Sequence, residues 1–148
     1  MDSYQVLNDV LVNLFRDIMD IEQRAVTCQE FPDITSNDLH VIEVIGVGEP
    51  KNMSTIAREL SVTVGTLTIS VNGLVKKGYV VRQRGLEDRR VVYISLSERG
   101  RSAYERHARF HREMIEGICS ALTPEEMAAL VKALEKLKGW FKELSSHE

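Results

Sequence analysis

The sequence predicts a mainly α-helical fold with one small β-hairpin, and three observations support this prediction. Apolar residues recur at helical spacing near both ends of the chain. Two short helices with capping residues follow each other between Asn52 and Gly78. Two runs rich in Val, Tyr and Ile then flank a charged loop between residues 79 and 96. This order is that of a winged helix-turn-helix, with an all-helical dimerisation lobe built from both termini.

The N-terminal part is expected to form two helices. The first carries a broad apolar stripe: Leu7, Val10, Leu11, Leu14, Phe15, Ile18 and Ile21. The second is expected from Ser36 to about Val47, because Thr35 is a good N-cap and Leu39, Ile42 and Ile45 follow at helical spacing.

Capping residues frame the next two helices. Asn52 precedes the helix Met53–Leu60, and Thr63 precedes a helix that ends at Lys77. Gly78 supplies the left-handed stop. The strands Tyr79–Arg84 and Val91–Leu96 are then expected to pair as the wing, with Glu87, Asp88, Arg89 and Arg90 in its loop.

Two more helices are expected at the C-terminal end. Ser97 caps a long helix to about Ser120, and Thr123-Pro124-Glu125-Glu126 forms a capping box before the last one. We expect a single domain, 1–148, in which 35–97 form the winged helix-turn-helix lobe and 1–34 and 98–148 form dimerisation helices. Such wide apolar stripes favour a two-fold dimer, although they are also compatible with internal core.

Charge is unevenly distributed along the chain. Residues 51–109 hold twelve Lys/Arg against five Asp/Glu, a net charge of +7, whereas the remainder has seven against seventeen, a net charge of −10. A basic region that coincides with the helix-turn-helix predicts binding to double-stranded DNA. A scaffold or a protein-binding winged helix remains an alternative.

The composition suits a soluble protein. No segment approaches the ~20 apolar residues that a membrane span needs. The N-terminus lacks the pattern of a signal peptide, so we expect a cytoplasmic location. Cys28 and Cys119 do not suggest a disulfide framework, and buried, inert thiols are favoured over a thiol sensor.

The chain resembles the multiple-antibiotic-resistance regulators, the MarR family, through Ile56–Leu60, Leu74–Val80 and Asp88–Gly100. This resemblance implies a homodimeric transcription regulator that places one helix in the major groove and a wing arginine in the minor groove. Carried onto this sequence, the candidate DNA contacts are Thr63, Val64, Gly65, Thr66, Thr68, Ile69, Asn72, Arg84, Asp88, Arg89 and Arg90.

These candidate contacts are expected to recognise different groups of the DNA. Asn72 can pair with adenine, whereas Thr66 and Thr68 can donate to phosphate or contact a thymine methyl group. The helix face carries no arginine, so we expect no arginine readout of guanine there. Asp88 is expected to brace an adjacent arginine, and either Arg89 or Arg90 to enter an A/T-rich minor groove.

Within the family, the chain is similar to the fatty-acid-biosynthesis repressors of Gram-positive bacteria. The segments Asp33–Thr35, His40–Gly46, Val62–Thr68 and Arg109–Met114 carry this likeness. It implies a repressor of lipid-synthesis genes, with long-chain acyl groups on acyl carrier protein as co-repressor. An acyl chain would then be a ligand. Arg106, Arg109 and Arg112 could meet the acidic carrier, although a solvated helix face is the favoured interpretation of these three residues.

The histidines support an alternative. The chain also resembles the zinc-uptake repressors of the family, which implies a zinc site at Glu22, His40, His107 and His111, with Cys28 as an extra ligand. A repressor of lipid-synthesis genes would require no cofactor. An enzyme is not expected, because a zinc hydrolase needs an open ligand position and no nucleophile motif is evident.

Overall fold

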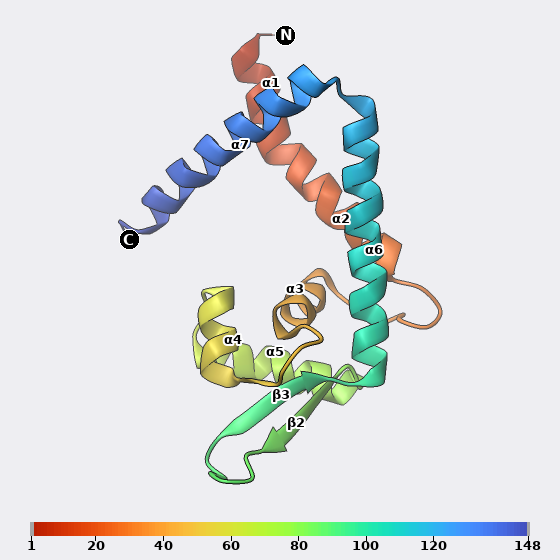
Figure 1. The fold of residues 1–148 in the computed structure, drawn as a ribbon, viewed down its shortest axis with the longest axis vertical. Helices are drawn as coiled ribbons and strands as arrows, with labels where there is room; N and C mark the ends of the chain where they lie inside the picture. Colours follow the sequence, from red (N-terminus) through yellow and green to blue (C-terminus); the bar gives the residue numbers. More distant parts are fainter. Residues whose placement is uncertain (1, 148) are drawn as a thin grey trace. The chain divides into compact units, whose positions relative to one another are not determined.

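The computed structural model describes residues 2–147, and Figure 1 shows its helices and strands. The chain divides into two compact units, Met1–Phe110 and His111–Glu148. The elements in chain order are α1 (Ser3–Asp9), the π-helical turn η1 (Val10–Leu14), α2 (Phe15–Val26), α3 (Ser36–Ile45), β1 (Lys51–Asn52), α4 (Met53–Leu60), α5 (Val64–Lys77), β2 (Val80–Arg84), β3 (Val92–Leu96), α6 (Glu98–Ala121) and α7 (Pro124–Ser145). The predicted fold class, mainly helical with a small hairpin wing, is confirmed.

The helix-turn-helix forms where its capping residues predict it. Asn52 Oδ1 accepts from the backbone N–H of Thr55 at 2.8 Å at the start of α4. Thr63 Oγ1 does the same for the N–H of Thr66 at 3.1 Å at the start of α5. Gly78 ends α5 with a φ of 87°, a left-handed conformation that favours glycine. These local bonds explain why α4 and α5 have the predicted bounds.

The sheet has one strand more than predicted. Its order is β1-β3-β2, with both pairs antiparallel, so that β3 lies in the middle. β1 consists of Lys51 and Asn52 alone, and they pair with Ile94 and Tyr93. Two residues are too few to show an alternating pattern, which is why the sequence indicated only the hairpin. The hairpin itself extends beyond α4 and α5 in Figure 1.

One hydrophobic core holds α5 in place. It joins residues of α2, the 27–35 loop, α3, α4, α5, the sheet and the start of α6, among them Val26, Phe31, Ile42, Ile56, Tyr79, Ile94 and Ala103. From α5 it takes Leu67, Val71 and Leu74, each at most 1% exposed. Because these three residues lie on one side of the helix, the opposite side of α5 faces solvent.

Three local features differ from the prediction. Helix α3 ends at Ile45 rather than near Val47, because Gly46 leaves the helix with a φ of 66°. The first predicted helix contains the π-helical turn Val10–Leu14, for which the sequence gives no signal. Cys119 is exposed and Cys28 is partly buried, so the expectation of two buried thiols is wrong.

The apolar stripes near both ends of the chain are exposed. None of the described residues of α1, η1 or α7 is buried. In the first unit the exposed large apolar residues include Leu7, Leu11, Leu14, Phe15 and Ile21. In the second they include Leu130, Leu134, Leu137, Phe141 and Leu144. Within residues 2–147, no helix combines the length and apolar character that crossing a membrane requires.

Candidate nucleic-acid interface

The outward side of α5 carries the predicted contact residues. Thr63, Val64, Gly65, Thr66, Ile69 and Asn72 are exposed and Thr68 is half-buried. Ile69 is 75% exposed, so its side chain is open to contact with a base. A Cβ atom on Gly65 would find only Thr63 Oγ1, at 3.8 Å. Packing therefore does not require this glycine, and its bare backbone is open to a close approach by a phosphate or a base.

The threonines of this face are already hydrogen-bonded. Thr63 Oγ1 donates to Thr66 Oγ1 at 3.0 Å, which orders the first turn of the helix. Thr68 Oγ1 donates to the carbonyl of Val64 at 2.7 Å. A hydroxyl group has one proton, so Thr68 in this arrangement cannot also donate to a phosphate. Its methyl group and its oxygen lone pairs remain available to a base.

An arginine from the wing joins this face. Arg82 of β2 donates from Nη1 to Oδ1 of Asn72 on α5, at 2.5 Å, and both residues are exposed. The helix itself has no arginine, but the strand supplies one. Sequence reasoning missed Arg82 because its contact with Asn72 depends on how β2 packs beside α5.

Asp88 braces Arg90 in the wing loop, as predicted. Arg90 donates from Nε to Oδ1 at 3.1 Å and from Nη2 to Oδ2 at 3.0 Å, a two-point pair. These side-chain bonds and the backbone N–H of Arg90 hold the pKa of Asp88 below its usual value, and the same carboxylate raises the pKa of Arg90. The Arg90 side chain is still 90% exposed. Asp88 therefore orients the Arg90 side chain but leaves it open to solvent.

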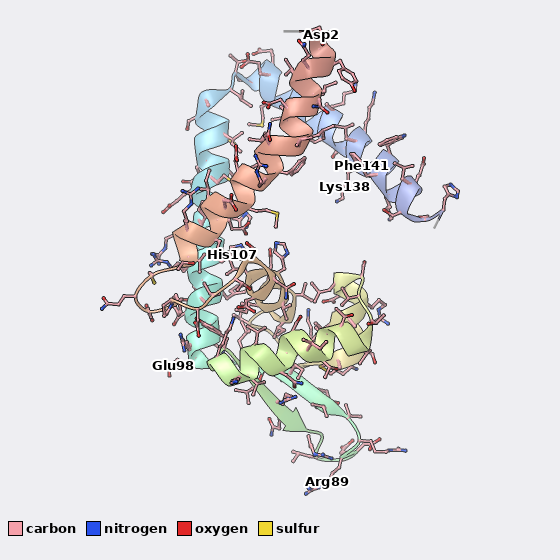
Figure 2. All side chains as sticks on the ribbon, turned by 180° about the vertical axis from the view of Figure 1, so that it is seen from behind. Asp2, Arg89, Glu98, His107, Lys138 and Phe141 are labelled. Carbon is pink, nitrogen blue, oxygen red and sulfur yellow. The ribbon has the colours of Figure 1, made fainter. Side chains whose placement is uncertain are left out.

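Arg84 and Arg89 complete the basic wing. Arg84 donates from Nη1 to the backbone carbonyl of Arg89 at 3.3 Å and so helps to close the loop. Figure 2 shows Arg89 at the tip of the hairpin, pointing away from the helices. Within the part of the chain that the structure describes, no carboxylate pairs with Arg89.

A polar network fixes the far end of α5. Arg99 of α6 donates to the carbonyl of Lys77 at 2.8 Å, and its guanidinium lies 4.5 Å from the centre of the Tyr79 ring. The Tyr79 hydroxyl donates to Asp33 at 2.7 Å, a bond that holds the pKa of Asp33 below its usual value. Burial raises the pKa of Tyr79 above its usual value. This network spans residues 33 to 99, and sequence reasoning did not find it.

The candidate metal ligands are only partly brought together. Glu22 of α2 and Nε2 of His107 on α6 are in direct contact, and both residues are buried in the first unit. His111 follows His107 by one turn of α6 and thus lies on the same side of that helix. His40 is exposed on α3 and is not among the described residues that could share an ion with them. Of the predicted set, the structure joins Glu22 and His107.

Comparison with known proteins identifies relatives of this chain. A model of the MarR family matches residues 33–91. FabT of Streptococcus pneumoniae, solved in complex with DNA, is 37% identical, with a TM-score of 0.88 over 96% of this chain and 99% of FabT. MepR of Staphylococcus aureus, also solved with DNA, is 25% identical, with a TM-score of 0.64 over 86% of this chain and 95% of MepR.

Two regulators of Bacillus subtilis match over a shorter part. The HTH-type transcriptional regulator YwhA is 34% identical over 55% of this chain and 59% of its own length. The HTH-type transcriptional regulator PchR is 28% identical over 67% of this chain and 60% of its own length. The chain thus spans about three fifths of these two relatives. These relatives are named as transcription regulators, which excludes the alternative that the chain is a zinc hydrolase. The chain belongs to the MarR family of winged-helix, DNA-binding transcription regulators.

Proposed function

We propose that the protein acts as a homodimeric repressor on a palindromic operator and controls genes of fatty-acid biosynthesis. Two features support binding to an operator. One side of α5 is exposed, and the wing beside it holds an exposed Arg90 in place through Asp88. In this proposal α5 enters the major groove of a duplex and the wing enters the minor groove.

The exposed apolar residues support the dimer. Within a single copy, α7 leaves Leu134, Leu137 and Phe141 between 41% and 50% exposed, and Leu14 and Phe15 are 47% and 57% exposed. A stripe of exposed apolar residues along one helix is normally covered by a partner. A second copy of the chain offers the same apolar surfaces and closes the assembly by a two-fold axis. Two copies of α5 would then meet half-sites about 34 Å apart along the duplex.

Arg90 is the residue we assign to the minor groove. Its two-point pair with Asp88 restricts the side chain before DNA arrives, so less conformational entropy is lost on binding. Because the guanidinium remains exposed, it can approach the negative potential of a narrow, A/T-rich groove. Arg89 at the tip then contacts the phosphate backbone.

The lipid assignment rests on the likeness to FabT and on the sequence segments that resemble fatty-acid-biosynthesis repressors. In this proposal a long-chain acyl group carried by acyl carrier protein strengthens operator binding. Each methylene that the protein buries gains about 0.8 kcal/mol. Arg106 and Arg109 line a small cavity of about 230 Å³ together with Glu30 and Glu105. In this proposal the exposed Arg109 meets the acidic carrier.

The test is operator affinity with and without the acylated carrier. Fluorescence anisotropy on a palindromic site upstream of lipid-synthesis genes should show tighter binding with long-chain acyl carrier protein. The unacylated carrier should leave the affinity unchanged. The variant Arg89→Ala/Arg90→Ala is the control for DNA contact, and it should bind weakly under all conditions. Equal affinity with acylated and unacylated carrier would refute the co-repressor while leaving DNA binding intact.

A second candidate is a zinc-responsive repressor, which the buried contact of Glu22 with His107 favours. A carboxylate oxygen and an imidazole nitrogen are ligands that Zn²⁺ prefers, and Glu22 and His107 supply one of each. Zinc bound there would join α2 to α6. We would measure the melting temperature and the operator affinity with zinc and with a chelator, for the wild type and for His107→Ala. Zinc effects that His107→Ala abolishes support this function, and no effect in the wild type rejects it.

A further inference from the structure

The contact between Arg82 and Asn72 fixes the chemistry that this part of the interface presents. Arg82 comes from the wing strand β2 and Asn72 from the exposed side of α5, ten residues earlier. The donor is Nη1 of Arg82 and the acceptor is Oδ1 of Asn72, at 2.5 Å. Neither residue has another side-chain hydrogen bond among the described residues. They form an isolated, solvent-facing pair on the proposed DNA-binding face.

The orientation of the Asn72 amide follows from the partner. The oxygen and nitrogen of an asparagine are often hard to tell apart, but a guanidinium only donates hydrogen bonds. The atom next to Arg82 must therefore be the oxygen. The two N–H bonds of Nδ2 are then on the other side of the amide. With the remaining N–H groups of Arg82, the pair presents donors to its surroundings.

This arrangement is poorly matched to adenine. An asparagine reads adenine by accepting from the N6 amino group while it donates to N7. Here the N6 amino group would have to reach an oxygen that already accepts from a cation, beside further donors of the guanidinium. Guanine instead offers two acceptors, O6 and N7, on its major-groove edge. A surface made of donors is complementary to guanine and repels the amino group of adenine.

We propose that Arg82 and Asn72 read one base pair together and select guanine, so that Arg82 determines specificity from the wing. This inference rests on the proposed operator binding and adds the base that the operator must carry. It replaces the expectation that Asn72 alone pairs with adenine.

The experiment is selection of bound duplexes from a randomised library, followed by sequencing. Asn72→Ala identifies the position that residue 72 reads, because the preference there is lost. The wild type should enrich guanine at this position in each half-site. Arg82→Met removes the donors but keeps the length of the side chain, and it should shift the guanine-to-adenine ratio by about tenfold toward adenine.

Arg84→Met is the matched control. It removes the same charge from the same strand, but Arg84 does not contact Asn72. It should lower affinity for all sequences and keep the guanine preference. Adenine enrichment by the wild type, or an unchanged preference in Arg82→Met, would overturn this inference alone. If the wild type enriched no sequence, operator binding itself would fail and the inference with it.

Discussion

The hydroxyl of Tyr79 donates to the carboxylate of Asp33 at 2.7 Å, which joins the second residue after α5 to the loop before α3. Tyr79 is fully buried, and Asp33 also faces Arg99 at 3.3 Å. The bond therefore lies where the 27–35 loop, the residues after α5 and the start of α6 meet. Its strength depends on pH, because one partner is a carboxylate.

We expect Tyr79→Phe to lower the free energy of unfolding by about 1 kcal/mol near neutral pH, the typical net value of one hydrogen bond. The pKa of Asp33 is lowered from 3.8, so its contribution is present above that pH and is lost as pH falls through the lowered pKa. The difference between wild type and Tyr79→Phe should thus shrink in acid. Urea denaturation at neutral and acidic pH measures it, and a constant difference would contradict the assignment.

Removing the carboxylate that braces Arg90 should weaken operator binding without removing a positive charge. Asp88→Ala leaves Arg90 free to move, so affinity should fall although the net charge of the wing rises by one. Arg90→Ala should weaken binding more, because it removes the cation assigned to the minor groove. Arg89→Ala should reduce the slope of log affinity against log salt by about 0.9, because it removes one phosphate contact. Anisotropy titrations at several salt concentrations give both quantities. Stronger binding by Asp88→Ala would show that Asp88 only repels the duplex.

The start of α6 requires a residue without a side chain. A Cβ atom at Gly100 would lie 2.0 Å from the carbonyl oxygen of Tyr79. We expect Gly100→Ala to destabilise the protein by about 2 kcal/mol, because backbone atoms must move apart. Gly73→Ala is the control, since it lies within α5 with nothing within 4 Å. It should raise stability by about 0.5–1 kcal/mol through helix propensity. Thermal denaturation compares the two, and equal effects would refute the steric argument.

The proposed dimer predicts different effects for two faces of α7. Leu134 belongs to its apolar stripe and is 50% exposed in the single chain. Leu134→Glu should shift the protein toward monomer at micromolar concentration and weaken operator binding. Lys132→Glu places the same residue two positions away, on another side of the helix. It should leave the dimer intact. Sedimentation velocity distinguishes the outcomes, and a monomeric wild type would reject the dimer.

The sequence predicted those parts of the fold that depend on local bonds. Thr63 and Gly78 act on their own backbone or on residues three or four positions away, so their effect on α5 is readable from the sequence. The brace between Asp88 and Arg90 was predicted for the same reason. β1, the Tyr79–Asp33 bond and the Arg82–Asn72 pair depend on packing between distant elements. None of these has a sequence pattern of its own.

The arginines of β2 also affect how the edge of the sheet behaves toward other molecules. β2 lies at an edge of the sheet, where unpaired backbone groups can recruit a strand from another molecule. Val80 is buried at its inner end, and Val81, Arg82, Gln83 and Arg84 are exposed along the rest of the strand. Charged residues at such an edge oppose strand addition and aggregation. The residues that attract a polyanion therefore also keep copies of the protein from joining sheet to sheet during the time they spend off DNA.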